Sequence, residues 1–573
     1  MKLQVGYDDF GNVRVNNLQF VDKTLFIKEI LDNNNISVSV ITRPRRFGKT
    51  FNLSTLRHFL APEVNQTKTD GMFDGLKIAT VDNGNYMQYQ GKYPVIFISF
   101  KEIKSERYDL TYSKLCALIA NVFDEHNYLK QSDKLTAKDK QVLQLIVDEK
   151  ADQAKIENSL YFLTSVLFKH HGVKPWLLID EYDTPIQSGY LHNYYGEIIG
   201  LMRGMFGAAL KTNSYLNRAV VTGILRIAKE SIFSELNNIT VYSLLQSQYG
   251  QHFGFTEEDV HELLVRTKLE NQKTEIRKWY NGYVFGGTTV YNPWSIVNYI
   301  NNQIFKAYWV NTSDNQLIKD QLIQSSTEFK EEFKLLLQDK TLEKIVDENM
   351  VFGDLKNNND AAWSLLLMSG YLKPVSIAID IKGKTICRLT IPNWEVKVLY
   401  CDIIEEWLGN GRGIMWYQNF LSYLLDGNVE KFVESFGEVL IRTISVYDLA
   451  HNPEAFYHGF MLGLAAGINQ EQYEIKSNRE SGLGRYDIAI IPKDVSKLAI
   501  ILEIKSISPP KVPEKNFPKV LDSLLTRESK KALEQINRNQ YSVDLAHRGI
   551  ANIVKIGLAF SGKEFRVASE VPN

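Results

Sequence analysis

The stretch ISVSVITRPRRFGKTFNLSTLRHFL, residues 36–60, decides the fold of the N-terminal part of the chain. Its beginning, residues 36–41, is a short run rich in β-branched side chains, which predicts a buried strand. Its end, FNLSTLRHFL, has apolar residues at helical spacing. The loop between them closes with Gly48, Lys49 and Thr50. The order of strand, loop and helix places these three residues at the start of a helix.

Gly48, Lys49 and Thr50 have the side chains that a phosphate-binding loop requires. Such a loop surrounds phosphate oxygens with backbone N–H groups, reaches the outer phosphates with a lysine and places a hydroxyl on magnesium. The strict motif has a further glycine five residues before Gly48, where this sequence has Arg43. An incidental helix N-terminus is the alternative that the tripeptide alone leaves open.

Three further strands are predicted downstream, at residues 94–100, 175–180 and 219–225, with helical segments between them. Strands that alternate with helices favour a parallel sheet covered on both faces. The second of these strands ends in Asp180 and is followed by Glu181, and parallel sheets bind ligands at the carboxyl ends of their strands. There, the first carboxylate would hold magnesium through water, and the second would orient or deprotonate the attacking water.

The strand at residues 219–225 contains one more candidate pair. Thr222 is a polar residue near its end, where a side chain can sense the γ-phosphate, and Arg226 lies one turn farther along. For each residue, a capping or surface role is an equally good interpretation.

Beyond these motifs, several stretches resemble the AAA-ATPase-like family: FVDKTLFIKEIL, RPRRFGKTFNLSTLRHFL, LLIDEYDTPI, VTGILRIAKESIFSELNNI, FGFTEEDV, WYNGYVFGG, YNPWSIVNYI and LLLMSGYL. In that family the ATPase region is typically followed by a PD-(D/E)xK nuclease-type domain. RPRRFGKT is itself the family's form of the phosphate-binding loop. The missing glycine is therefore a family trait.

The resemblance implies ATP and Mg²⁺ as ligands of the N-terminal region. Thr50 and Asp180 are expected to hold the magnesium, and Glu181 is expected to act on the attacking water. The residues expected around the nucleotide are Arg46, Phe47, Gly48, Lys49, Thr50, Phe51, Asp180 and Thr222. Asp22 and Lys23 also match a family motif, for which we infer only proximity to the base or ribose.

A second group of candidate catalytic and metal-binding residues lies near the C-terminus. Asp487 stands on one predicted strand, and Glu503 and Lys505 stand two apart on the next, so that both point to one face. Hydrolysis of a phosphodiester with magnesium needs carboxylates on the metal, an activated water and a cation near the phosphate. The carbonyl of Ile504 can add an oxygen ligand. A hairpin with ordinary surface charges is the alternative, but Glu503 follows the apolar run LAIIL, where an unpaired charge is costly.

Further residues of the C-terminal region resemble the family's nuclease domain. Glu454 and His458 stand four apart on a predicted helix, like an E-x-x-x-H motif; Glu454 would be a metal ligand, and His458 would bind phosphate or metal, or cap a core. Arg485 stands in a match to the signature GxGRxD. Gln535 and Tyr541 resemble a helix that contacts nucleic acid, with helical packing as the alternative.

The composition is that of a folded soluble protein, with 66 Lys and Arg against 67 Asp and Glu and a net charge of -1. This balance hides a local basic excess in residues 505–555, which favours a nucleic-acid groove over a solvated helix face. Three well-separated cysteines, no signal-peptide core and no long apolar run predict a cytoplasmic protein without a membrane span. The basic residues of the local excess are Lys511, Lys515, Lys519, Arg527, Lys530, Lys531, Arg538 and Arg548.

The sequence thus predicts an α/β protein of three parts. We expect a P-loop ATPase domain with a parallel sheet at residues 1–255. A helical lid and connector is expected at residues 256–445, with a hairpin that turns at residues 382–384. A restriction-endonuclease-like PD-(D/E)xK domain is expected at residues 446–573. We expect an ATPase coupled to a Mg²⁺-dependent nuclease that acts on nucleic acid, chiefly DNA. Mn²⁺ is expected to be able to replace Mg²⁺ in the nuclease. A P-loop nucleotide switch whose C-terminal domain binds nucleic acid or a partner without cutting is the alternative. An arginine supplied in trans would make the protein a homo-oligomer.

Overall fold

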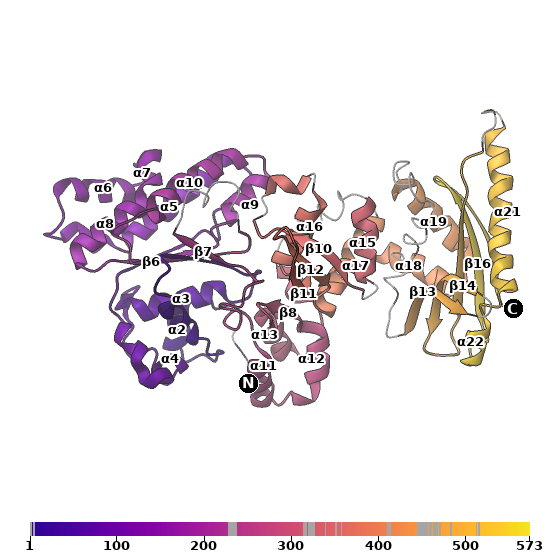
Figure 1. Ribbon diagram of the computed structural model, residues 1–573, viewed down its shortest axis with the longest axis horizontal. Coiled ribbons are helices and arrows are strands. Elements are labelled where there is room, and N and C mark those ends of the chain that lie inside the picture. Colours follow the sequence, from indigo (N-terminus) through magenta and orange to yellow (C-terminus); the bar gives the residue numbers. More distant parts are fainter. Residues whose placement is uncertain are drawn as a thin grey trace. The chain divides into compact units, whose positions relative to one another are not determined.

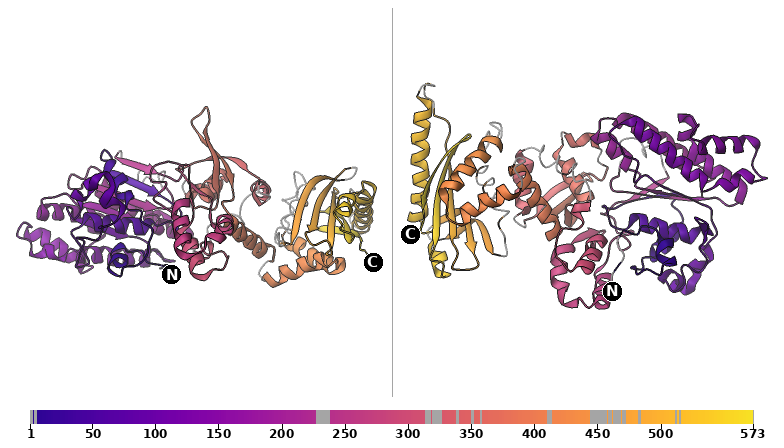
Figure 2. Two further views of the ribbon diagram at one scale, coloured as in Figure 1. Left: turned by 90° about the horizontal axis from the view of Figure 1, so that it is seen from below. Right: turned by 180° about the vertical axis from the view of Figure 1, so that it is seen from behind.

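The chain divides into two compact units, shown as a computed structural model in Figures 1 and 2. The first unit comprises Met1–Gln321 and Thr341–Val396, and the second comprises Leu322–Lys340 and Lys397–Asn573. The structure describes residues 3, 6–226, 238–312, 318, 327–337, 340–349, 352–356, 358–409, 414–443, 457, 461, 468, 472–481, 484–510, 513 and 516–572. The three-part division expected from the sequence stays a prediction.

The first unit is built on a five-stranded sheet in which every strand pair is parallel. In spatial order its strands are β4 (Val95–Ser99), β5 (Trp176–Asp180), β6 (Arg218–Gly223), β1 (Val38–Thr42) and β7 (Ile239–Tyr242). The predicted α/β fold with a parallel sheet is confirmed. β7 was not predicted, because its four residues are too few to show a pattern and this edge strand is only partly buried.

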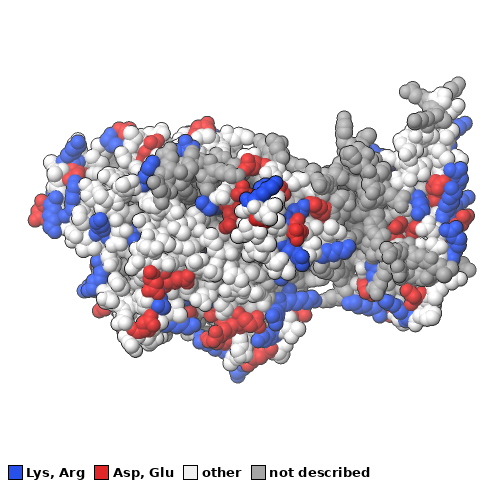
Figure 3. Space-filling model, viewed as in Figure 1, with Lys and Arg blue, Asp and Glu red and all other residues white. Residues whose placement is uncertain are grey.

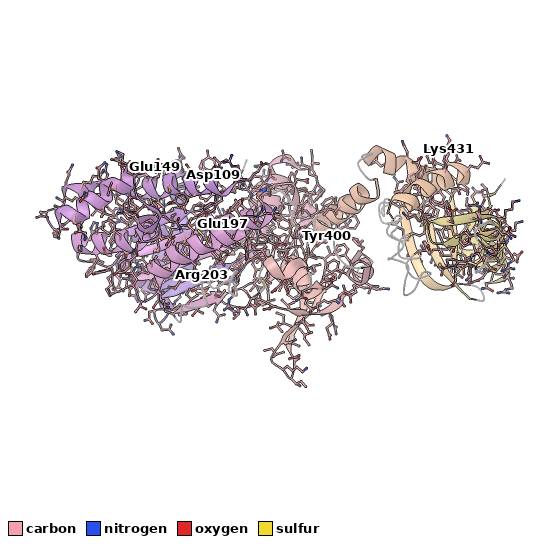
Figure 4. All side chains as sticks on the ribbon, turned by 90° about the horizontal axis from the view of Figure 1, so that it is seen from above. Asp109, Glu149, Glu197, Arg203, Tyr400 and Lys431 are labelled. Atoms are coloured by element: carbon pink, nitrogen blue, oxygen red, sulfur yellow. The ribbon has the colours of Figure 1, made fainter. Side chains whose placement is uncertain are left out.

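Helices cover both faces of this sheet (Figure 1). One layer contains α2 (Leu25–Asp32), α3 (Lys49–Leu60) and α4 (Lys77–Thr80), and the other contains α5 (Tyr108–Asp124), α6 (Ala137–Val147), α7 (Gln153–Glu157), α8 (Ser159–His171), α9 (Thr184–Leu191) and α10 (Tyr195–Leu210). Figure 4 labels Asp109 of α5 and Glu197 and Arg203 of α10, which lie exposed on the outer side of the second layer. The three central strands β5, β6 and β1 are buried throughout, as continuous apolar runs predict.

The part of the chain after residue 255 was predicted to be a helical lid and connector with one hairpin, but the structure contains further strands there. Three helices pack around a common apolar core: α11 (Glu257–Thr267), α12 (Lys273–Tyr280) and α13 (Pro293–Asn302). They are joined by a short hairpin of β8 (Tyr283–Phe285) and β9 (Thr288–Val290), and the unit ends with α16 (Asn359–Met368) beside a second sheet. That antiparallel sheet has the order β10 (Leu342–Val346), β12 (Thr385–Thr390) and β11 (Lys373–Ile379). The predicted hairpin at 382–384 is confirmed as the turn between β11 and β12.

The second unit contains a five-stranded mixed sheet. Its spatial order is β13 (Tyr473–Ser481), β14 (Gly484–Pro492), β15 (Ala499–Ser506), β16 (Ile553–Ser561) and β17 (Glu564–Glu570), and only β15 and β16 run parallel. Alternate residues of β14 and β15 pack against different helices: one face meets α18 (Ile414–Leu425) and α19 (Val429–Thr443), and the other meets α21 (Phe517–Arg538) and α22 (Val543–His547). The mixed α/β character is as predicted, and β17 was not expected.

The remaining helices are α1 (Phe10–Val15), α15 (Thr327–Leu337) and α17 (Trp394–Gly409). In the parts of the chain that the structure describes, no helix has both the length and the apolarity needed to cross a membrane.

Candidate active sites

The loop that follows β1 ends at Gly48, which takes the left-handed conformation with φ 84° and begins α3. Only glycine adopts this conformation freely, which explains the residue at this position. No side chain caps the N-terminus of α3, so the amides of its first turn remain available to an anion. The backbone therefore has the form of a phosphate-binding loop although the strict motif is incomplete.

Lys49 lies over this loop with its ammonium group buried. Its Nζ donates hydrogen bonds to the carbonyl oxygens of Arg43, at 3.1 Å, and Pro44, at 3.0 Å. Burial lowers the pKa of Lys49, and the nearby carboxylates of Glu181 and Asp180 oppose this change. The ammonium is thus held at the loop by weak neutral acceptors, which a phosphate would replace with stronger, charged ones.

Arg43, which stands in place of the motif's first glycine, is a structural anchor. Its guanidinium is fully buried and donates to the carbonyl oxygens of Thr42 at 2.7 Å, Tyr242 at 2.9 Å and Gln248 at 3.0 Å. The guanidinium carbon also lies 5.4 Å and 5.3 Å from the ring centres of Phe253 and Phe285. Burial lowers the pKa of Arg43 to about 9. Sequence reasoning missed this role because the partners lie about 200 residues away.

Asp180, at the end of β5, forms hydrogen bonds with two other residues that the sequence assigned to the nucleotide site. Its Oδ2 accepts a hydrogen bond of 2.7 Å from the hydroxyl of Thr50, and its Oδ1 accepts one of 2.7 Å from Thr222. Ser99 adds a longer contact of 3.3 Å to Oδ2. Asp180 is fully buried, and burial together with the charge of Glu181 raises its pKa. A hydroxyl and a carboxylate in this arrangement fit the oxygen ligands that magnesium prefers.

Glu181 adopts a positive φ of 50°, which is strained for a residue with a side chain. Its carboxylate lines the cavity next to the loop and receives a long hydrogen bond of 3.4 Å from Thr184. Asp183, which sequence reasoning did not select, is buried and accepts hydrogen bonds from the backbone of Ile224 at 2.8 Å and Leu225 at 3.0 Å. Asp183 therefore fixes the end of β6, directly after Thr222.

The cavity beside the loop has a volume of about 870 Å³. Its lining includes polar groups of the phosphate-binding loop and of Glu181. It also includes apolar residues, among them Phe20, Val21, Phe51, Phe255, Leu263, Trp294 and Val297. The guanidinium of Arg46 lies 4.5 Å from the ring centre of Trp294. Phe47 is fully buried and packs against Tyr283, Phe285 and Trp309. The volume of this cavity and its mixed polar and apolar lining suit a nucleotide.

Asp22 and Lys23 join separate parts of the first unit. Asp22 accepts a hydrogen bond of 2.7 Å from the backbone of Lys77, and Lys23 donates to the carbonyl of Gln251 at 2.9 Å and pairs with Asp259. Lys23 also lines the cavity, but its ammonium is engaged by these partners. Arg226 is half-buried, and its Nε has no hydrogen-bond partner among the described residues.

In the second unit, the sheet brings Asp487 and Glu503 together. The pairing of β14 with β15 ends at Ile488 and Leu502, and Asp487 and Glu503 directly adjoin this last pair on the two strands, where the charge of Asp487 acts on Glu503. Asp487 Oδ2 accepts a hydrogen bond of 2.7 Å from the backbone N–H of Ile504, and Lys505 Nζ lies 3.4 Å from Glu503 Oε1. The four residues that the sequence selected here thus share one short stretch of the sheet.

Glu503 is the most unusual group of this site. It is 2% exposed, and burial followed by the charge of Asp487 raises its pKa to about 7. Its Oε2 is buried without a hydrogen-bond partner among the described residues. An unpartnered carboxylate oxygen beside a second carboxylate fits a divalent cation, which would supply the missing partner.

Gln535 and Tyr541 also reach this site. Gln535, on α21, donates to Glu503 Oε1, and its Nε2 lies 3.5 Å from the hydroxyl of Tyr541. Asn539 donates to the same hydroxyl at 2.9 Å, and Tyr541 is buried in the core between α21 and the sheet. In the structure the amide of Gln535 contacts Glu503, and its contact with nucleic acid stays a prediction.

Some predicted site residues cannot be compared with the structure. Glu454 and His458 lie outside the described residues, and so does the side chain of Arg485. In the described ranges there is no group of three or more His, Cys, Asp and Glu that could hold a metal ion. The fit to a divalent cation therefore rests on Asp487 and Glu503.

The local basic excess of residues 505–555 is partly neutralised. Arg527 and Lys531 pair with Glu528, and Arg548 pairs with Glu474. Figure 3 shows basic side chains on the side of α21 with acidic ones between them. Lys511 and Lys515 lie outside the described residues. Within the described part, the surface of α21 is therefore mixed rather than uniformly positive.

Comparisons with known proteins match both regions. Residues 4–233 match the family described as "Predicted AAA-ATPase", and residues 452–570 match the PD-(D/E)XK nuclease superfamily. The chain is also 24% identical over 462 residues to a protein of Azotobacter chroococcum mcd 1 described as "Uncharacterized protein in vnfD 5'region". The similarity covers 80% of this chain and 81% of that relative.

Proposed function

Because the chain carries an AAA-ATPase-like domain followed by a PD-(D/E)XK nuclease superfamily domain, we propose that it hydrolyses ATP and cuts phosphodiester bonds in nucleic acid. The observation that carries the nuclease part is Glu503, a buried carboxylate close to Asp487 whose Oε2 has no hydrogen-bond partner among the described residues. The hydrogen bond between Thr50 and Asp180 supports the ATPase part.

In the ATPase domain, the first-turn amides of α3 and Lys49 bind the phosphates. Thr50 and Asp180 would hold a magnesium ion, which supplies charge neutralisation at the β- and γ-phosphates. Thr222 keeps Asp180 oriented through its hydrogen bond of 2.7 Å. Glu181 orients the attacking water from the edge of the cavity, where its strained backbone holds the carboxylate next to the loop.

In the nuclease domain, Asp487, Glu503 and the carbonyl of Ile504 would hold the divalent cation, with Glu454 as a further ligand. The cation supplies an activated water and neutralises charge on the scissile phosphate. Lys505 orients that water or offsets the charge that develops on the phosphate. Burial raises the pKa of Glu503 to about 7, so this carboxylate would lose a proton on binding a divalent cation.

The finer features of the proposal follow from the sequence. The substrate is DNA, the cation is Mg²⁺ with Mn²⁺ as a substitute, and the protein is cytoplasmic and forms a homo-oligomer in which an arginine can act in trans. The free thiols of Cys116 and Cys387 support a reducing compartment.

The test is cleavage of labelled DNA and RNA by the full chain with Mg²⁺ or Mn²⁺, with and without ATP. Asp487→Ala should abolish cleavage, and Asp494→Ala, which removes an exposed acid of the same unit, should leave it unchanged. Lys49→Ala should abolish ATP binding in calorimetry, with Lys68→Ala as the surface control. Equal cleavage by wild type and Asp487→Ala would overturn the nuclease assignment. Nucleic-acid binding without cleavage would instead support the nucleotide switch.

A further inference from the structure

The hairpin formed by β11 and β12 carries large apolar side chains in full contact with solvent. Val375, Ile377, Ile379 and Ile381 stand at alternate positions and are 56%, 44%, 75% and 102% exposed. Single exposed aliphatic residues are ordinary, but four within seven residues form a patch, and such patches mark interaction sites. Figures 2 and 4 show the hairpin as an arm that extends away from its sheet.

The end of the arm is basic. Lys382 and Lys384 are exposed, and neither forms an ion pair with another residue that the structure describes. Asp380, the one acid of the turn, is used within it: its carboxylate accepts hydrogen bonds from the backbone of Lys382 at 2.8 Å and Lys384 at 2.7 Å. Gly383, with φ 76°, allows the tight turn. The turn therefore occupies its acid and leaves both ammonium groups in water.

The edge of the sheet is also open along the arm. β11 is the outer strand of the order β10, β12, β11, so within the described part of the chain no strand pairs with the other side of its backbone. Arg388 of β12 stands opposite Glu343 of β10 in the strand register, so a residue of opposite charge faces it across the sheet. Figure 3 shows basic side chains over this region with acidic ones beside them. At the tip, Lys382 and Lys384 place two positive charges close together in solvent.

A partner of this arm must present negative charge to the tip and apolar surface to the stripe. Nucleic acid offers both, in its phosphates and in the methyl groups and faces of its bases. A two-stranded ribbon fits the major groove of B-form DNA, which is about 12 Å wide, and aliphatic side chains also wedge between base steps. A second copy of the arm fits less well, because β11 has no free acid to meet the lysines of its partner.

We propose that the β11–β12 hairpin is a nucleic-acid contact of the first unit, with Lys382 and Lys384 on phosphates and Ile379 and Ile381 against bases. The proposal rests on the proposed function in that its ligand is the nucleic acid that the C-terminal domain cuts. It adds a binding element that lies outside the nuclease domain.

The test uses the full chain in EDTA, where binding is measured without metal-dependent cleavage. Fluorescence anisotropy with a labelled 30-base-pair DNA duplex and with its single strand gives the affinity at several KCl concentrations. Lys382→Glu/Lys384→Glu should weaken binding at least tenfold and flatten the dependence of log affinity on log salt by about 2. The matched control is Lys138→Glu/Lys140→Glu, with the same spacing and charge change on α6, and should stay within twofold of wild type.

The apolar contact has its own variant. Ile379→Ser/Ile381→Ser should weaken binding at least threefold and leave the salt dependence unchanged, since no charge is altered. Equal affinities of the hairpin and control variants would overturn the proposal. So would a wild-type dimer that the serine variant converts to a monomer at unchanged affinity, because the stripe would then join two copies. If the wild-type protein cuts nucleic acid but the hairpin variants bind DNA normally, only the proposed role of the hairpin fails. If the hairpin variants lose affinity for DNA but the wild-type protein does not cut, only the nuclease assignment fails.

Discussion

Thr50 donates a hydrogen bond of 2.7 Å to Asp180, which joins the start of α3 to the end of β5 across the intervening strand β6. The two residues are 130 positions apart in the chain. Their contact holds a hydroxyl and a carboxylate at the place where a nucleotide-bound magnesium ion would meet them.

Thr50→Ser should keep Mg²⁺-dependent ATP binding, and Thr50→Val should lose it. Both replacements are close in size to threonine, but only serine retains the oxygen that faces Asp180. We expect at least a tenfold weaker affinity for Mg·ATP in the valine variant, measured by calorimetry, with little change in the affinity for ATP in EDTA. Equal Mg·ATP affinities in the two variants would remove Thr50 from the magnesium site.

Arg43→Gly, which restores the strict motif, should destabilise the first unit instead of improving it. Three carbonyl oxygens and two aromatic rings would lose their partner, and loss of such a buried group costs about 3–5 kcal/mol. The measurement is the midpoint of urea unfolding by tryptophan fluorescence. Arg45→Gly is the control, because Arg45 is only half-buried and its guanidinium bonds the side chain of Gln187. A midpoint for Arg43→Gly equal to that of the control would contradict the anchoring role.

Glu395 should make the first unit less stable as the pH rises. It is fully buried, and burial raises its pKa to about 7 although Ser295 and the backbone of Trp309 donate hydrogen bonds to it. The unfolded state ionises at lower pH, so the stability from this group is complete below about pH 4.5 and is lost as the pH passes 7. The loss is at most about 3 kcal/mol.

The measurement for Glu395 is the free energy of unfolding at pH 5 and pH 8. Glu395→Gln cannot ionise, so the difference between wild type and this variant should shrink from pH 5 to pH 8, while other titrating groups cancel. A difference that stays constant would show that Glu395 is ionised throughout.

Gln535→Leu should slow cleavage without weakening nucleic-acid binding. In the structure the amide of Gln535 donates to Glu503 Oε1, so its loss leaves Lys505, at 3.4 Å, as the remaining contact that positions this oxygen. We expect at least a tenfold lower kcat and a binding constant within twofold of wild type. The opposite pattern, weaker binding at an unchanged kcat, would support direct contact between Gln535 and the substrate.

Local patterns allowed much of the fold and the sites to be predicted. The strand, glycine loop and helix around Gly48 need only neighbours in sequence, and so does the apolar run that ends at Asp180. The role of Arg43 was hidden because Tyr242 and Gln248 are distant in sequence, and β7 was hidden because a four-residue edge strand shows no clear period. The contact of Gln535 with Glu503 depends on how α21 lies on the sheet, which no local pattern specifies.

The environment of Arg43 restricts how the sequence can vary among related chains. The guanidinium of Arg43 lies close to the rings of Phe253 and Phe285. Replacement of Arg43 alone by a smaller residue would leave a void and unpaired carbonyl groups, so the residues around it must be replaced as well. Positions 43, 253 and 285 are therefore expected to change together among related chains. A pattern search that demands glycine at the first of these positions passes over every chain built in this way.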